Sequence, residues 1–307
     1  MKAKSLGQIT DFDLRLLRMF KTVVECGSFT AAESVLGITR SAISLHMSDL
    51  EKRLGMRLCQ RGRAGFALTD EGREILRHSE SMMAAVENFR QQVNQMHKHL
   101  RGEFNIGIIN NLVTQPRMQI TDALDALRDD GSEIHINISM LTAAEIERGL
   151  MDGRLHAGAL PLTAPVSGLV YTPLYEEISQ LYCSREHALF GTAATAKAEA
   201  LSHYDAVAPA FRTPAEAMQL QQSLTCTATA SDREGIAFLI LTGRFIGFLP
   251  DHYAAQWVEK KLMRAIAPEQ LRYSSTIALV RRQGQRHNAI LERFMQALTL
   301  PSTSLTG

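Results

Sequence analysis

The chain has 307 residues, of which 45% are apolar and 21% charged, and its net charge at pH 7 is +1. This length is sufficient for two or three domains, and the composition is that of a folded globular protein and excludes a generally disordered one. The first residues lack the apolar block of a secretory signal, and no apolar run approaches the roughly 18 residues of a membrane span. We therefore expect a cytoplasmic protein without a membrane partner.

The charge is unevenly distributed along the chain. Residues 1–65 contain 11 Lys and Arg against 6 Asp and Glu, whereas the rest holds the other 22 of 33 basic and 26 of 32 acidic residues. A basic N-terminal module on an acidic body indicates a polyanionic partner for the module alone. The four cysteines (Cys26, Cys59, Cys183 and Cys226) are scattered without a C-x-x-C pair, so we expect no metal site and no disulfide framework.

Three short helices are predicted near the N-terminus. Apolar residues at helical spacing predict the first over residues 13–24. Ser28 can cap a second helix that ends at Leu36, Gly37 supplies a tight turn, and Thr39 can cap a third. Two helices joined this closely must cross steeply, as in a helix-turn-helix.

The third helix is apolar on one face only. Ile43, Met47, Leu50 and Leu54 form an inward stripe, which leaves polar residues and Leu45 outward. This mixture suits the base edges and thymine methyl groups of the DNA major groove, although a surface helix pair in an ordinary α-helical domain is the alternative. The candidate DNA-contacting residues of these helices are Ser28, Thr30, Thr39, Arg40, Ser41, Ser44, Leu45, His46, Ser48 and Arg53.

A wing is predicted after the third helix. Two short strands around Gly62 and Gly65 would form a hairpin within the segment R-G-R-A-G-F-A-L-T, residues 61–69. This hairpin would carry Arg61 and Arg63 toward the phosphate groups of DNA, whose contacts position a protein on the duplex.

Residues 31–61 (A-A-E-S-V-L-G-I-T-R-S-A-I-S-L-H-M-S-D-L-E-K-R-L-G-M-R-L-C-Q-R) and 67–72 (A-L-T-D-E-G) resemble the winged helix-turn-helix of LysR-type transcriptional regulators. The resemblance implies a dimer or tetramer that binds an interrupted near-palindrome in double-stranded DNA, with RNA polymerase as a partner. Arg40 and Ser41 stand where many relatives carry Gln and Pro or Ser, and Cys59 replaces a usual Phe, so the operator sequence is not predicted.

A long helix is predicted from Thr69 to Leu100. Its apolar residues alternate at steps of four and three, with Ser79 as the one polar exception, which predicts pairing with a second copy of the chain. Packing on its own domain is the alternative, but the resemblance implies dimerisation through this helix. The candidate dimerisation residues are Ile75, Met82, Val86, Phe89, Val93 and Met96.

Residues 102–307 have an α/β pattern. Alternating strand and helix signals predict βαβ units and a parallel sheet. The first set comprises strands 104–109, 134–140 and 157–160 and helices 116–127 and 142–151. The second comprises strands 178–183, 205–208, 225–229 and 245–249 and helices 214–223, 231–241 and 252–260, before strand 276–280 and helix 287–298. The strict alternation of residues 134–140 predicts a strand with one less buried face.

The return of the chain predicts that the second set is inserted into the first, with two crossovers as a hinge. Residues 101–107 (R-G-E-F-N-I-G) and 243–250 (G-R-F-I-G-F-L-P) resemble LysR-type sensor domains, which are similar to periplasmic binding proteins, whereas Leu155-His156 departs from their usual Leu-Asp. The predicted fold is multidomain, α and α/β. It comprises a winged helix-turn-helix (1–67), a linker helix (68–101) and a sensor domain (102–307), with lobe I at 102–173 and 275–300 and lobe II at 174–274.

A ligand site is expected beyond the carboxyl ends of the strands, where helices begin. Helix N-termini there favour an anion, and Phe211 and Phe248 suggest a partly aromatic one, although capping alone is the alternative for each residue. The candidate effector-binding residues are Asn110, Asn111, Thr114, Leu141, Thr142, Ala208, Phe211, Thr213, Ser231, Gly247 and Phe248.

No motif of catalysis, of phosphate binding or of metal binding occurs in the sequence, so we expect neither an enzyme nor a cofactor. The expected function is that of a LysR-type transcriptional regulator controlled by an unidentified small-molecule effector bound between the two lobes. The alternative is a small-molecule-binding protein or enzyme whose N-terminal helices mediate protein contacts.

Overall fold

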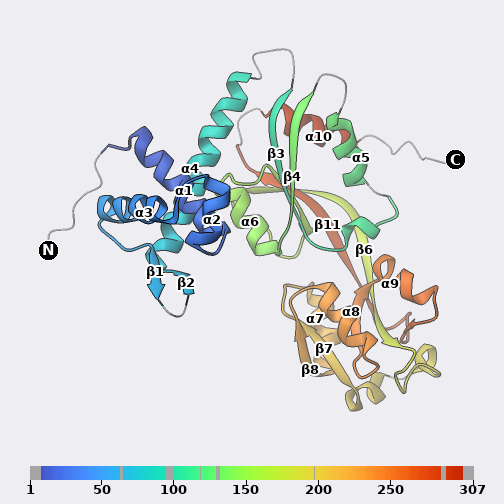
Figure 1. Cartoon of the computed structure of the whole chain (residues 1–307). Helices are drawn as coiled ribbons and strands as arrows, with labels where there is room; N and C mark the ends of the chain where they lie inside the picture. Colours follow the sequence, from blue (N-terminus) through green and yellow to red (C-terminus); the bar gives the residue numbers. More distant parts are fainter. Residues whose placement is uncertain are drawn as a thin grey trace. The chain divides into compact units, whose positions relative to one another are not determined.

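The computed structural model (Figure 1) describes residues 8–62, 65–94, 100–117, 119–128, 132–196, 198–284 and 288–299. The chain divides into two compact units, Met1–Asn88 and Phe89–Gly307. The boundary lies within the long helix predicted after the wing. Within the described ranges, every helix is too short or too polar to span a lipid bilayer.

The first unit has the three predicted helices and the predicted wing. It consists of α1 (Asp11–Glu25), α2 (Phe29–Leu36), α3 (Arg40–Leu54), β1 (Cys59–Gly62) and β2 (Gly65–Leu68). The Ser28 hydroxyl accepts a hydrogen bond from the Ala31 N–H (3.0 Å), and Thr39 accepts one from Ala42 (3.3 Å), so α2 and α3 begin where predicted. Between them Gly37 adopts a φ of 65°, a left-handed conformation that glycine reaches without strain.

The core of this unit confirms the inward stripe of α3. Ile43, Met47 and Leu50 are each at most 1% exposed and pack in one cluster with Leu16 and Phe20 of α1. Because a helix that buries one face leaves the opposite face outside, this packing fixes which residues of α3 can meet a partner.

Helix α4 (Asp70–Asn94) begins as predicted, since the Thr69 hydroxyl accepts a hydrogen bond from the Gly72 N–H (2.8 Å). The predicted dimerisation seam, however, has two parts. Ile75 and Met82 pack against the core of the first unit, as the alternative interpretation proposed. The later residues Val86, Phe89 and Val93 are exposed, by 48%, 66% and 42%, and Met96 lies outside the described residues. The first part of the seam therefore contacts the chain's own first unit, because the start of α4 closes the helix-turn-helix core.

The second unit contains a mixed sheet, which corrects the predicted parallel one. The parallel part is β4 (Glu133–Met140), β3 (Arg101–Ile108) and β5 (Ala157–Pro161). Two long strands, β6 (Leu169–Ser184) and β11 (Arg272–Arg282), run antiparallel to each other, and β11 is antiparallel to β5. Figure 1 shows β6 and β11 connecting the two lobes, which confirms the two predicted crossovers. The sheet is mixed because the chain passes from one lobe to the other along β6 and returns along β11 in the opposite direction.

The sheet order is β10-β6-β11-β5-β3-β4, in which β10 is Met263–Ala265, and β9 (Gly247–Pro250) also pairs with β6. Strand β4 therefore lies at an edge. On the polar face of its alternating pattern His135 is exposed and Asn137 and Ser139 are half-buried, as predicted for the less buried face. Ile138 and Met140 are exposed as well, although they lie on the apolar face with the buried Ile134. The other elements of lobe I are η1 (Leu112–Thr114), α5 (Gln119–Asp125), η2 (Ala126–Arg128), α6 (Ala143–Met151) and α10 (Ala289–Thr299). The helix predicted over residues 116–127 is thus shorter than expected and ends in a 3₁₀ turn.

Lobe II has a separate two-stranded parallel sheet, β7 (Asp205–Pro209) and β8 (Thr225–Ala230). Its other elements are η3 (Ala193–Thr195), η4 (Ala198–His203), α7 (Ala215–Gln222), α8 (Arg233–Leu241), β9 (Gly247–Pro250), α9 (Asp251–Val258) and β10 (Met263–Ala265). Each lobe has its own buried apolar core, so the two can move as separate bodies about the crossover strands.

Candidate functional sites

The outward face of α3 carries the polar set expected of a DNA-reading helix. Arg40, Ser41 and Leu45 are exposed, and Ser44 and Ser48 are half-buried on the same side. Leu45 is 59% exposed although it lies between two buried residues, Ile43 and Met47. An apolar side chain among hydroxyl and guanidinium groups fits the mixture of thymine methyl groups and hydrogen-bonding base edges in a major groove.

Two residues of the predicted DNA-contacting set, His46 and Arg53, have partners within the first unit. Both lie about 120–140° around α3 from Ser41, given 100° per residue. The His46 ring packs edge-on against Phe12 of α1, with 6.5 Å between centroids. Arg53 binds the carboxylate of Asp13 and the backbone carbonyl of Gln8. Their side chains hold α3 against α1.

The Asp13–Arg53 pair is partly buried. Asp13 is 5% exposed, and its carboxylate accepts hydrogen bonds from Arg53 (2.6 Å) and from the N–H and hydroxyl of Thr10 (2.7 and 2.8 Å). Burial by itself would raise the pKa of Asp13, but these hydrogen bonds outweigh it and hold the pKa below its ordinary value. The carboxylate is therefore ionised at neutral pH.

The remaining predicted DNA contacts are two helix caps, an exposed residue and the wing. Ser28 and Thr39 cap α2 and α3, and Thr30 is exposed in the first turn of α2. Strands β1 and β2 pair antiparallel, with Gly62 opposite Gly65 at the tip. Arg63 and the side chain of Arg61 lie outside the described residues.

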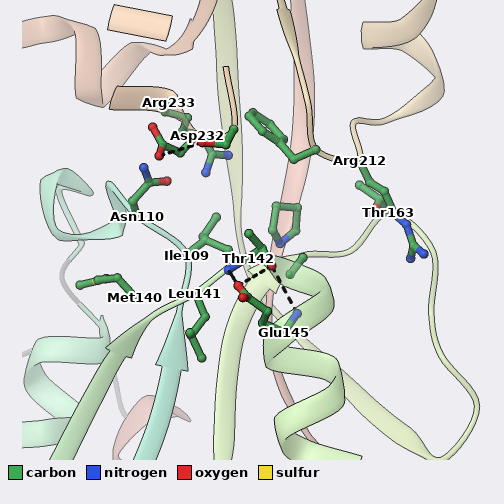
Figure 2. A pocket seen from close by; sticks show the side chains of 14 residues that line it. Ile109, Asn110, Met140, Leu141, Thr142, Glu145, Thr163, Arg212, Asp232 and Arg233 are labelled. Atoms are coloured by element: carbon green, nitrogen blue, oxygen red, sulfur yellow. Dashed lines mark hydrogen bonds between the residues drawn. The ribbon is translucent and has the colours of Figure 1, made fainter. Parts of the chain in front are cut away.

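A cleft of about 220 Å³ lies between the lobes of the second unit (Figure 2). Its walls come from the ends of β3, β4 and β5 in lobe I and from the loops after β7 and β8 in lobe II. It is lined by Ile109, Asn110, Met140, Leu141, Thr142, Ala143, Glu145, Pro161, Thr163, Phe211, Arg212, Ser231, Asp232 and Arg233. Five predicted residues are therefore brought together here: Asn110, Leu141, Thr142, Phe211 and Ser231.

Two predicted effector residues of lobe I instead contact lobe II. The Thr114 hydroxyl lies 2.7 Å from Nδ1 of His252, and the Asn111 side chain lies close to Tyr253. Both partners belong to α9, which starts where β9 ends. These residues lie next to Asn110 in sequence, but the 3₁₀ turn η1 directs them away from the cleft lining.

The other predicted residues outside the cleft belong to lobe II. Ala208 and Thr213 are not among the lining residues. Phe248 is 5% exposed and packs on Tyr273, with 5.4 Å between ring centroids. At Gly247 a Cβ would lie 2.8 Å from Ile236, so this glycine allows α8 to pack closely on β9. Gly247 therefore serves packing, whereas Phe248 packs in the core of lobe II and also borders a small cavity with Phe211 and Arg233.

The N-termini of α6 and α8 already carry carboxylates. Thr142 donates its hydroxyl and its N–H to Glu145 (2.7 and 2.9 Å), and these bonds hold the pKa of Glu145 below its ordinary value (Figure 2). Helix α8 is capped by Asp232, which accepts a 2.8 Å bond from Gly235, and not by the predicted Ser231. Because a side-chain carboxylate occupies both of these helix ends, the N-termini of α6 and α8 do not favour a further anion.

The positive charges of the cleft are two arginines that sequence reasoning missed. The Arg212 guanidinium lies 3.9 Å from Glu147 of α6, and Arg233 binds the buried Glu177 at 2.6 Å. Arg212 directly follows the predicted residue Phe211, and Arg233 lies two positions after the predicted Ser231. The sequence therefore identified the two loops that carry these arginines. Thr163 was missed because the end of β5 was not considered as a part of the site.

Within the described ranges, no group of three His, Cys, Asp or Glu side chains has the geometry of a metal site. The sequence likewise predicts no catalytic arrangement of acid, base and nucleophile. The cleft can bind a small polar molecule between the two lobes. The outward face of α3 can present polar side chains to DNA.

The chain matches known proteins along nearly its whole length. Residues 14–73 match the family described as bacterial regulatory helix-turn-helix protein, lysR family, and residues 97–300 match the LysR substrate binding domain. The HTH-type transcriptional activator BauR of Pseudomonas aeruginosa is 61% identical over 297 residues, which cover 96% of this chain and 97% of the relative.

Solved structures show the same fold at low sequence identity. CbnR, a LysR family transcriptional regulator, is 19% identical with a TM-score of 0.68, over 93% of this chain and 97% of that chain. CbnR complexed with its target DNA is also 19% identical, with a TM-score of 0.67 over 93% and 98% of the two chains. Full-length AphB of Vibrio cholerae is 18% identical, with a TM-score of 0.59 over 93% and 98%.

Proposed function

Because the chain belongs to the LysR family of transcriptional regulators, we propose that it activates transcription in response to a small molecule bound in the inter-lobe cleft. It is a DNA-binding regulator and not an enzyme. The 61% identical relative is a transcriptional activator, which supports activation over repression. We place this activity in the cytoplasm, where the DNA is, with RNA polymerase as the protein partner.

The proposed DNA-binding form is a dimer or tetramer on an interrupted near-palindrome. Val86, Phe89 and Val93 support self-association, because they place exposed apolar side chains on one stripe of α4 at steps of three and four residues. A two-fold axis between two chains would present two copies of α3, and the operator would repeat that symmetry in its half-sites.

The effector site rests on one observation: the lining of the cleft comes from both lobes. A ligand there contacts both bodies, so it can favour one hinge state by its difference in affinity between the states. The volume of about 220 Å³ is below the roughly 300–1,000 Å³ of sites for drug-sized ligands, which supports a small metabolite.

The test is ligand-dependent thermal unfolding of the full-length protein. The ligands are metabolites chosen from the substrates of enzymes encoded beside its gene. Ala143→Phe should fill the cleft without removing the Thr142 cap, whereas Ala144→Phe places the same ring at the next, exposed position. A metabolite that binds in the cleft raises the Tm of wild type and Ala144→Phe but not of Ala143→Phe. An equal rise in all three would place the effector elsewhere.

A further inference from the structure

A row of buried polar side chains joins the cleft to the contact between the lobes. Arg233 of α8 donates a 2.6 Å hydrogen bond to Oε1 of Glu177 on the crossover strand β6. The other oxygen of Glu177 lies 3.0 Å from Nε2 of His252 at the start of α9, and Nδ1 of His252 lies 2.7 Å from the Thr114 hydroxyl of lobe I. We call Arg233, Glu177, His252 and Thr114 the inter-lobe relay.

The relay is largely removed from water. The side chain of Glu177 is 0% exposed, that of His252 5% and that of Arg233 10%. A buried carboxylate is costly unless it is paired and hydrogen-bonded, so Glu177 requires partners on both oxygens. One oxygen holds α8 and the other holds α9. A movement of α8 therefore alters the surroundings of the Glu177 carboxylate, which also holds α9. A movement of α9 does the same for α8.

One end of the relay opens into the cleft. Arg233 lines it on the lobe II side, and Phe211, another lining residue, lies with its ring centroid 5.9 Å from the guanidinium (Figure 2). A guanidinium has five N–H donors. Among the described residues, Glu177 accepts a hydrogen bond from the Arg233 guanidinium. Donors remain for an acceptor group of a bound ligand.

The other end of the relay lies where η1 contacts α9. Thr114 is the last residue of η1, and Asn111, which directly precedes η1 with a φ of 72°, lies close to Tyr253 of α9. These contacts join lobe I to lobe II through side chains alone. They can therefore break or form as the lobes rotate, without loss of backbone hydrogen bonds.

We propose that Glu177 and His252 are positioning residues that couple occupancy of the cleft at Arg233 to the contact between η1 and α9. This inference rests on the proposal that the effector binds in the cleft. An acceptor group of the ligand engages the donors of Arg233 and draws the guanidinium from Glu177. Glu177 is then held chiefly by His252, and the change reaches Thr114 through the imidazole ring.

Hydrogen exchange of the full-length protein tests the relay. Glu177→Gln keeps the side-chain shape but replaces one acceptor oxygen by a donor. The matched control is Glu176→Gln, on the opposite face of β6, whose carboxylate binds Ser274 and Thr276 instead. We expect Glu177→Gln to speed exchange in residues 109–117 and in α9 by about two- to tenfold, the effect of one lost hydrogen bond, and Glu176→Gln to leave both segments unchanged.

Non-additivity separates coupling from a simple loss of structure. Arg233→Gln and Thr114→Val touch different partners, so independent effects on the exchange of α9 would add. The relay predicts that the double variant departs from additivity by at least about threefold, whereas Arg233→Gln with Thr276→Val is additive. Additive behaviour of both pairs, or equal effects of Glu176→Gln and Glu177→Gln, overturns the proposal.

If Glu177→Gln fails to fold, Thr114→Val carries the test from the far end. It removes one hydroxyl and should speed exchange in α9, and unchanged exchange there also overturns the proposal. The outcome of hydrogen exchange is independent of the outcome of thermal unfolding with ligands. An effector that binds elsewhere leaves the exchange pattern intact, and a failed relay leaves the contrast between Ala143→Phe and Ala144→Phe intact.

Discussion

Arg53, near the end of the DNA-reading helix, donates a 2.6 Å hydrogen bond to Asp13, which lies 40 residues earlier near the start of α1. Asp13 is buried, and the Arg53 side chain is 38% exposed. The pair therefore fixes α3 to α1 at the end opposite to Arg40. The exposed residues of α3 are presented by a helix that is held at both ends, by the hydrogen bond from the Arg40 N–H to Glu33 of α2 and by this ion pair.

The first prediction concerns acid stability. The pKa of Asp13 is lowered in the folded state, so its contribution is fully present above the unfolded value of about 3.9 and is lost as the pH falls through the folded pKa. Asp13→Asn should destabilise the first unit by about 1 kcal/mol at pH 7. It should also flatten the loss of stability below about pH 4, measured as hydrogen exchange of α1 and α3. An unchanged acid profile would mean that the ion pair contributes nothing.

The second prediction concerns base readout. Arg40→Ala or Ser44→Ala should weaken specific operator binding by about 1–3 kcal/mol if the residue contacts a base edge. Lys52→Ala is the control on the same helix, since Lys52 pairs with Asp49 at 3.4 Å. Arg63→Ala should weaken binding to all sequences alike and lower the salt slope by about 1. The measurement is affinity for operator and random DNA across salt concentrations. Wild-type discrimination in all variants would contradict the assignment of α3.

The third prediction separates the two parts of α4. Phe89→Asp places a charge on the exposed part of the stripe and should dissociate the oligomer while both units stay folded. Met82→Asp places the same charge against the core of the first unit and should unfold that unit instead. Sedimentation gives the mass and circular dichroism the helix content. An unchanged mass for Phe89→Asp would show that α4 does not mediate self-association.

The fourth prediction concerns close packing in lobe I. A Cβ on Gly158 of β5 would overlap Ile146 of α6, so Gly158→Ala should cost about 1–3 kcal/mol through displacement of that helix. Gly191→Ala is the control, because no atom lies within 4 Å of its added Cβ. Denaturant unfolding of the full-length protein measures both. Equal stabilities would mean that α6 moves away at no cost.

Local signals were sufficient for most helices and strands. Capping residues such as Ser28, Thr39 and Thr69 act on N–H groups three residues away, so their hydrogen bonds can be predicted without knowledge of the fold. The apolar stripe of α3 likewise determined which face is buried. The loops that form the cleft followed from the rule that ligands bind beyond the carboxyl ends of strands.

Contacts between distant segments required the tertiary structure. Arg53 and Asp13 are far apart in sequence, and so are Ile75 and the core that it covers, so no local pattern distinguishes a DNA contact or a dimer seam from internal packing. Asn110 lines the cleft, whereas Asn111 and Thr114 bind α9, because the turn η1 rotates successive side chains to different partners. The sequence by itself determined the caps of α2, α3 and α4 and most of the loops that line the cleft. The tertiary structure alone decided which side chain of each loop meets a ligand and which meets the other lobe, because that depends on side-chain direction across an interface that the chain forms only when folded.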